Sequence, residues 1–177
     1  RLPQPMTNIL EPIWHIYEQS FPDDERRRYE QLIELFGSEQ PIRIEILTDS
    51  DSAVGFIIYW DFDRFVYIEH FAVDSIARGQ GIGSRALSDF VQRANKPIIL
   101  EVEHPTDAIT RRRINFYRRL GFVLHDEEYI QPPYDKNKQS VPLCIMSKAF
   151  SDFSEQFVEV KNTLYNQVYG VNDIENG

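Results

Sequence analysis

The sequence predicts an α/β fold with a mixed, mainly antiparallel central sheet, flanking helices and an added carboxy-terminal helix. Its 177 residues, 42% hydrophobic and 27% charged, have the composition of a packed globular chain. Runs rich in β-branched and aromatic residues at 41–48, 53–60 and 65–73 are joined by short turns and predict an antiparallel meander. A glycine-rich turn, a helical stretch and a short apolar run follow, which predicts one crossover connection and therefore a mixed sheet.

Two helices are expected before the first strand. Between Asn8 and Ser20, apolar side chains recur every three or four residues, as on one face of a helix. Pro22 ends this helix, and a second apolar stripe begins at Tyr29 and stops at Gly37.

The rest of the chain alternates between the two kinds of element. In order, the pattern predicts a helix from 82 to about 95, a strand from 98, a helix from about 106 to 120, and strands at 122–129 and 141–148.

A last helix is predicted beyond Ser151. Asp152 and Glu155 have capping-box spacing, and an apolar stripe follows them as far as Gly170. We therefore expect a main domain over 1–150 and a helical extension with a tail over 151–177. The stripe either covers the core or forms a surface for a partner or for a homodimer.

Composition narrows the classes of function. A net charge of −9 disfavours nucleic-acid binding, which needs a basic face. The single cysteine, Cys144, excludes a disulfide within the chain and a cysteine-based zinc cluster, and fits a reducing cytoplasm. No apolar run reaches the roughly 18 residues of a membrane helix. We expect a cytoplasmic protein that uses no membrane, nucleic acid or metal.

The stretch RGQGIGS, residues 78–84, places three glycines at alternate positions between a strand and a helix. Glycine permits positive φ and lets a ligand approach the main chain closely. A nucleotide-hydrolase loop is excluded, because no Gly-Lys-Ser/Thr sequence follows. A dinucleotide-binding turn needs a glycine in place of Ser84, although Glu101 stands where its ribose-binding acid would lie. The third interpretation is a cradle of backbone N–H groups for a diphosphate at a helix amino terminus.

Two motifs follow one another along the chain, Arg78-x-x-Gly81-x-Gly83 and Tyr117-x-x-x-Gly121-Phe122. Together they resemble the GNAT superfamily of acetyl-CoA-dependent N-acetyltransferases. Either would be weak alone, but their order, with a strand between them, makes the match specific. The similarity in element order covers about 7–148.

The resemblance implies that acetyl-CoA is bound and that its acetyl group is transferred to a primary amine by direct attack. It assigns these positions to cofactor binding: Phe71, Ala72, Val73, Arg78, Gly79, Gln80, Gly81, Ile82, Gly83, Ser84, Thr110 and Tyr117. Thr110 departs from the family pattern, because many relatives carry an asparagine there that contacts the cofactor.

Direct attack requires a base, because an amine is mostly protonated at neutral pH. Glu69 is the first candidate, with an ammonium ligand and a solvated carboxylate as its alternatives. Glu101 and Glu103 alternate onto one face of the next strand and are second candidates, or else belong to a solvated strand end. Tyr117 is the family's general acid, or a buried aromatic side chain.

The amine acceptor is a small molecule or a peptide. The resemblance places it among aromatic and acidic side chains, which suit an ammonium group. The predicted substrate-binding residues are Phe21, Glu25, Glu69, Tyr129 and Tyr134. A non-catalytic acyl-CoA sensor with the same fold is the alternative function.

Overall fold

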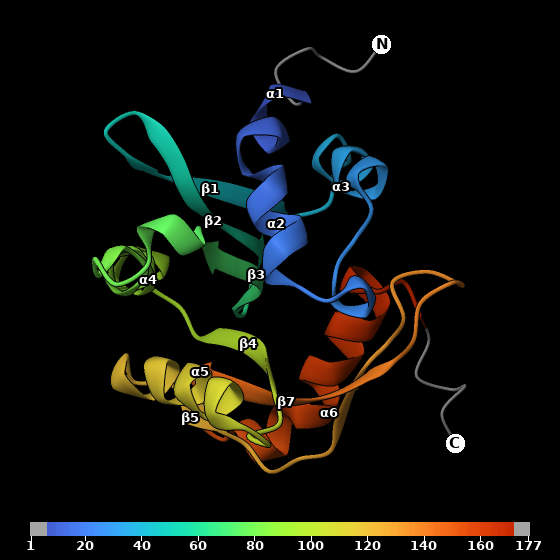
Figure 1. Ribbon diagram of the computed structural model, residues 1–177. Helices are drawn as coiled ribbons and strands as arrows, with labels where there is room; N and C mark the ends of the chain where they lie inside the picture. The colour runs from blue at the N-terminus through green and yellow to red at the C-terminus, as the bar shows by residue number, and fades with distance from the viewer. Residues whose placement is uncertain (1–6, 172–177) are drawn as a thin grey trace. The chain divides into compact units, whose positions relative to one another are not determined.

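The computed structural model describes residues 7–171 (Figure 1). The chain divides into two compact units, Arg1–Ile99 and Leu100–Gly177, and the boundary falls within strand β4 (Ile98–Glu103). The division that the sequence suggests at residue 150 stays a prediction.

The first unit begins with helical segments. The expected single helix over 8–20 is interrupted, since α1 (Thr7–Leu10) and α2 (Trp14–Ser20) are separated by a 3₁₀ turn, Glu11–Ile13. Pro12 lies in that turn, and its missing N–H breaks the α-helical hydrogen-bond pattern. A second 3₁₀ turn, Asp23–Glu25, leads to α3 (Tyr29–Phe36).

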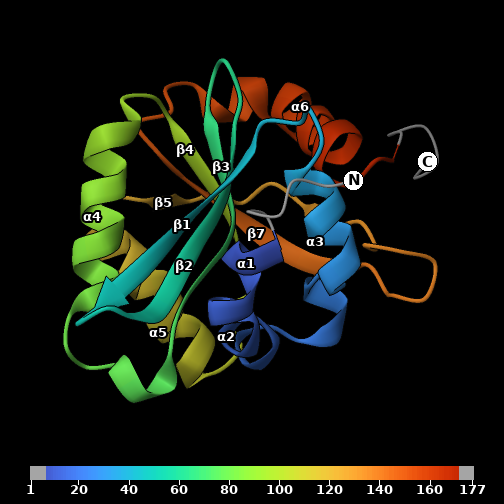
Figure 2. The same cartoon turned by 90° about the horizontal axis from the view of Figure 1, so that it is seen from above.

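The predicted meander is confirmed in the first unit. Strands β1 (Ile42–Asp49), β2 (Ser52–Asp61) and β3 (Val66–Val73) pair antiparallel in sequence order. Figure 2 shows α4 (Ile82–Ala94) on one side of these strands and α2 and α3 on the other.

Helix α4 ends where the sequence predicts. Asn95 has φ 50° and closes the helix in the left-handed conformation. Leu87 and Phe90 are buried, and the Phe90 ring meets Tyr59 of β2 edge-on with centroids 4.8 Å apart. The helix therefore packs on the sheet through the apolar face that its sequence pattern predicts.

The second unit contains α5 (Ala108–Arg119), β5 (Val123–Leu124), β6 (Tyr129–Gln131) and β7 (Val141–Lys148). The single strand expected at 122–129 is divided into β5 and β6, and both pair antiparallel with β7. Most strand pairs in the molecule are antiparallel and helices flank them, so the predicted fold class is confirmed.

The carboxy-terminal helix α6 (Phe153–Thr163) continues into a π-helical turn, Leu164–Val168. The predicted capping box is wrong, because Asp152 has φ 57° and its side chain makes no cap hydrogen bond. The Glu155 N–H instead bonds to the Asp152 carbonyl oxygen at 3.1 Å. Phe153, Val160 and Leu164 are buried, which favours the core-covering interpretation of the stripe. Figures 1 and 2 show α5 and α6 on opposite sides of β7.

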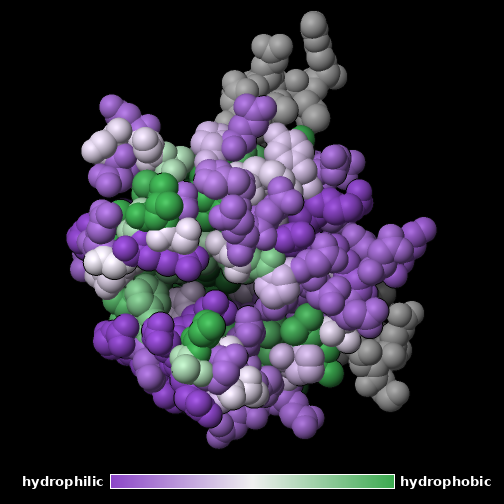
Figure 3. Space-filling view, in the orientation of Figure 1, coloured by the Kyte–Doolittle hydropathy of each residue, from purple (hydrophilic) through white to green (hydrophobic). Residues whose placement is uncertain are grey.

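The molecular surface seen in Figure 3 is mostly hydrophilic. Among the described residues, the large hydrophobic side chains that are exposed lie on five different elements: Ile76, Ile109, Val123, Ile130 and Val158. No helix within 7–171 has both the length and the apolar character needed to cross a bilayer. The expected cytoplasmic location and homodimer stay predictions.

Candidate active site

The glycine turn connects β3 to α4, and its glycines serve two different purposes. Gly79 and Gly81 have φ values of +85° and +73°, a region that other residues rarely adopt. Gly83 has ordinary φ, but a Cβ there would lie 3.2 Å from Val73 Cγ2 and 3.4 Å from Phe71 Cζ. Two glycines thus shape the loop, whereas Gly83 allows α4 to approach β3 closely.

The turn presents hydrogen-bond donors. Among the described residues, no N–H group from Gly79 to Ser84 makes a backbone hydrogen bond of ordinary geometry outside the helix. Arg78 lies beside them, with its Nε donating to the Val73 carbonyl oxygen at 3.2 Å. Arg85 donates from Nη1 to the Gln80 carbonyl oxygen at 3.0 Å. Free N–H groups at a helix amino terminus, with guanidinium groups nearby, form a site that suits an anion such as a diphosphate.

A hollow of about 400 Å³ adjoins this turn. It lies between β1 and α4 and extends along most of the helix, and Gln80, Ile82 and Arg85 form part of its wall. The turn is therefore open to solvent on this side.

Glu69 lies on β3 with its side chain fully buried. Its Oε2 is 2.9 Å from Arg27 Nε, and its Oε1 accepts a hydrogen bond from Trp60 Nε1 at 2.7 Å. The interpretation of Glu69 as a solvated carboxylate is therefore wrong. Glu69 is part of a buried ion pair.

Two predicted substrate-binding residues, Phe21 and Glu25, lie near Glu69 around His70. The Glu25 carbonyl oxygen is 2.7 Å from His70 Nε2, and the Phe21 ring packs against the His70 ring with centroids 4.6 Å apart. His70 Nδ1 is 3.9 Å from Glu69 Oε2. Tyr17 joins this group, and burial together with the Glu69 charge raises the pKa of its hydroxyl. The structure therefore brings Phe21, Glu25 and Glu69 together in the first unit.

Tyr117 lies on α5 in the second unit and is 8% exposed. Its ring packs against Phe122 and Phe116, with centroids 5.7 and 5.3 Å away. Burial raises the pKa of Tyr117 to about 12. The hydroxyl is protonated at neutral pH, as a general acid must be, and its packing fits the structural interpretation equally well.

Thr110 takes part in the capping box at the amino terminus of α5. Its N–H donates to Asp107 Oδ1 at 2.8 Å, and its Oγ1 accepts from the Asp107 N–H at 3.1 Å. The Thr110 side chain therefore helps to cap the start of α5.

Glu101 and Glu103 lie on β4 but have different surroundings. Glu103 forms an exposed ion pair with Arg113 at 3.1 Å, with 37% of its side chain accessible, and so fits the solvated interpretation. The Glu101 carboxylate accepts from the Tyr169 hydroxyl at 2.7 Å on Oε1 and at 3.0 Å on Oε2. Glu101 is therefore held within the second unit rather than solvated.

Two predicted substrate-binding residues belong to the Glu101 group. Burial and the Glu101 charge raise the pKa of Tyr129 well above its usual value. Tyr134 packs against Tyr169 with ring centroids 5.3 Å apart. Tyr169 is not among the predicted site residues, because the stripe in this part of the chain indicated only a cover for the core or a surface for a partner.

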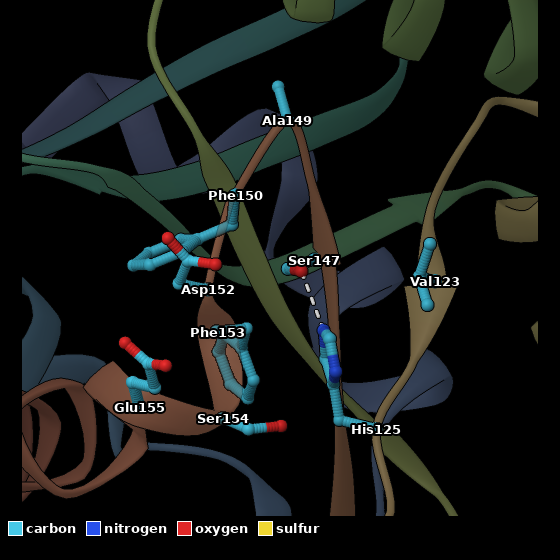
Figure 4. Close-up of a pocket in the computed structure, with 9 residues that line it drawn as sticks. All are labelled: Val123, His125, Ser147, Ala149, Phe150, Asp152, Phe153, Ser154 and Glu155. Carbon is cyan, nitrogen blue, oxygen red and sulfur yellow. Dashed lines mark hydrogen bonds between the residues drawn. The ribbon is translucent and has the colours of Figure 1, made fainter.

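A separate pocket of about 390 Å³ lies in the second unit, and none of the predicted catalytic, cofactor-binding or substrate-binding residues line it (Figure 4). In it, His125 Nε2 is 2.6 Å from Ser147 Oγ, and the His125 ring stacks on Phe153. Burial lowers the pKa of His125, so the imidazole is neutral at pH 7. Within 7–171, no group of three His, Cys, Asp or Glu side chains is arranged to hold a metal ion.

Known proteins resemble this chain in sequence and in fold. A solved structure described as "Putative acetyltransferase from GNAT family from Bacteroides thetaiotaomicron" is 37% identical, with a TM-score of 0.83, and the match covers 90% of this chain and 93% of that one. The curated "Putative acetyltransferase YjbC" of Bacillus subtilis (strain 168) is 37% identical over 68 residues. That match covers 37% of this chain and 35% of the relative, so the chain spans about a third of that relative's length.

A more distant structure shares the fold. It is described as a GNAT family acetyltransferase from Elizabethkingia anophelis with acetyl-CoA bound. It is 14% identical, with a TM-score of 0.52, and the match covers 70% of this chain and 84% of that one. A family model described as the acetyltransferase (GNAT) family matches residues 6–122. The chain therefore belongs to the GNAT family of acetyltransferases.

Proposed function

We propose that this protein transfers the acetyl group of acetyl-CoA to a primary amine of a small molecule or a peptide. The observation that supports the proposal is the turn before α4, where no N–H group from Gly79 to Ser84 makes a backbone hydrogen bond outside the helix among the described residues. The diphosphate of coenzyme A is an anion that fits such a cradle. A dinucleotide-binding turn would follow the first strand of a parallel sheet, whereas this turn follows an antiparallel meander.

Acetyl-CoA supplies an activated thioester carbonyl. In the transfer, the amine nitrogen forms a bond to the carbonyl carbon and the carbon–sulfur bond breaks. One proton leaves the amine, and one proton goes to the departing thiolate. The chain must therefore provide a proton acceptor and a proton donor.

Tyr117 is the proposed donor. Burial keeps its phenol protonated at neutral pH, so the proton is available when the thiolate departs. Its hydroxyl can then recover a proton from solvent between turnovers.

Glu101 is the proposed acceptor. The Glu69 carboxylate faces the Arg27 guanidinium, and this permanent positive charge stabilises its ionised form and weakens it as a base. Glu101 accepts from the Tyr169 hydroxyl, which orients its carboxylate. We propose Glu101 as the proton acceptor, and we propose that Glu69 orders β3 and its neighbours through its ion pair.

The diphosphate cradle is tested by a matched pair of glycine substitutions. Gly79 and Gly170 both have positive φ, and a Cβ at either position would meet no heavy atom within 4 Å. Gly79→Glu and Gly170→Glu therefore impose similar backbone strain, but only the first places a carboxylate in the turn. A ligand at 100 times its Kd stabilises a protein by about 2.7 kcal/mol.

The measurement is the rise in melting temperature that acetyl-CoA causes. We expect this rise in the parent protein and in Gly170→Glu, and its loss in Gly79→Glu. An equal rise in both variants would refute the cradle. Thiol release from acetyl-CoA with a panel of amines then separates an enzyme from an acyl-CoA sensor, which would bind without releasing thiol.

A further inference from the structure

Arg85, in the first turn of α4, binds two consecutive carbonyl groups of the glycine turn. Its backbone N–H donates to the Gly81 carbonyl oxygen at 3.1 Å, as the residue that begins a helix usually accepts the first helical hydrogen bond. Its side chain folds back and donates from Nη1 to the Gln80 carbonyl oxygen at 3.0 Å. One residue thus fixes the orientation of two adjacent peptide groups.

The orientation of a carbonyl group also determines that of the next N–H group. In a planar trans peptide, the C=O and N–H bonds point in opposite directions. Because the oxygens of Gln80 and Gly81 are held toward Arg85, the N–H groups of Gly81 and Ile82 point away from it. Among the described residues, neither N–H group makes a backbone hydrogen bond outside the helix. Arg85 therefore orients two donors of the candidate cradle.

The absence of a side chain at Gly81 makes room for this contact. A Cβ at Gly81 would lie 2.9 Å from Arg85 Nη1, closer than such atoms approach, so a side chain there would displace the guanidinium group. Gly79 also has positive φ, but a Cβ there would meet no heavy atom within 4 Å. Gly81 is therefore required for the Arg85 contact as well as for the shape of the turn.

The contact lies at the protein surface. Gln80 and Arg85 are both exposed, and both line the hollow between β1 and α4. Loss of the Arg85 side chain leaves no cavity in the core, so the stability of the fold should change little. A peptide group that is no longer held must be ordered when a ligand binds to its N–H, and this lowers the affinity for the ligand.

We propose that Arg85 is a positioning residue for the diphosphate of acetyl-CoA. It holds the carbonyl groups of Gln80 and Gly81 so that the N–H groups of Gly81 and Ile82 face the ligand. The backbone makes the contact with the diphosphate, and Arg85 acts through the backbone. This inference rests on the function proposed above, with the turn at 78–84 as the diphosphate site.

The alternative is that Arg85 attracts the diphosphate only through its charge, and salt separates the two roles. Attraction between exposed charges is screened at high ionic strength, whereas the cost of ordering a loose peptide group is not. Arg93 provides a matched control, because it lies further along α4, lines the same hollow and pairs with Glu45 at 2.8 and 2.9 Å. Arg93→Met removes an equal charge from the helix without a change in the turn.

The test is the Kd of acetyl-CoA, measured by titration calorimetry at low and high salt for the full chain, Arg85→Met and Arg93→Met. We expect Kd to rise about three- to tenfold in Arg85→Met, with the same ratio to the parent at both salt concentrations. The melting temperature of ligand-free Arg85→Met should stay close to that of the parent. In Arg93→Met we expect the parental Kd. Parental affinity in Arg85→Met, or a loss that disappears at high salt, overturns the inference.

A second measurement needs no ligand. The backbone ¹⁵N order parameter of Gly81 reports how firmly its peptide group is held. A lower order parameter in Arg85→Met than in Arg93→Met supports the inference, and equal values overturn it. Failure of the proposed function would instead appear in the parent protein, as an absence of acetyl-CoA binding or of thiol release with every amine.

Discussion

Glu69 of the first unit and Glu101 of the second are both strand carboxylates withdrawn from solvent, but their partners differ. Glu69 faces the Arg27 guanidinium and the Trp60 indole N–H, whereas Glu101 accepts from the Tyr169 hydroxyl. An ion pair with a guanidinium favours the ionised carboxylate more strongly than a hydrogen bond from a hydroxyl does, and a stronger preference for the ionised form makes a weaker base. The two proposed roles, proton acceptor for Glu101 and structural ion pair for Glu69, can therefore be separated by matched substitutions.

The largest effect is expected from Glu101→Gln. The amide keeps the shape of the side chain but cannot accept a proton from an amine, so kcat should fall by about 10²–10⁴-fold. The melting shift with acetyl-CoA should be retained. A Glu101→Gln variant with parental kcat would remove the distinction between the two carboxylates.

The matched substitution Glu69→Gln should act on stability. It removes the anion that faces the buried Arg27 guanidinium, and breaking such a pair costs about 3–5 kcal/mol. For a chain of this size, this lowers the melting temperature by roughly 10 °C. Scanning calorimetry measures the change. If Glu69→Gln melts like the parent but loses kcat, the two roles must be exchanged.

Tyr117→Phe should have a smaller effect, and it tests the donor that both assignments require. Loss of the phenol proton should lower kcat by about 10–100-fold, because the thiolate must then take its proton from water. The ring packing against Phe122 remains, so stability should change little. Steady-state kinetics at saturating acetyl-CoA provide the measurement, and an undiminished kcat would leave Tyr117 with a packing role alone.

Local patterns predicted much of the fold. The boundaries of β7 and the end of α4 at Asn95 follow from runs of apolar residues and from residues that stop an element. The glycine turn is also predicted, because the three glycines that define it lie within seven consecutive residues, 78–84. The sequence predicts that Gly83 lets a ligand approach the main chain. The structure adds that a side chain at this position would crowd Val73 of β3, which only the packing of the helix on the strand reveals.

The partners of the two carboxylates could not be predicted in this way. Arg27 and Glu69 are 42 residues apart, and Glu101 and Tyr169 are 68 apart, so no local period connects them. The apolar stripe predicted a helix as far as Gly170 but gave no sign of the π turn, next to which Tyr169 is buried. The predicted cap at Asp152 failed because the residue adopts left-handed φ, which spacing alone does not reveal.

The most direct test of this account is thiol release from acetyl-CoA, measured with one panel of primary amines for the parent protein, Glu101→Gln and Glu69→Gln, at a temperature where all three are folded. We expect one thiol per acetylated amine in the parent, near-complete loss in Glu101→Gln, and release close to the parental rate in Glu69→Gln. Loss in Glu69→Gln with full release in Glu101→Gln, or no release by the parent with any amine, would contradict it.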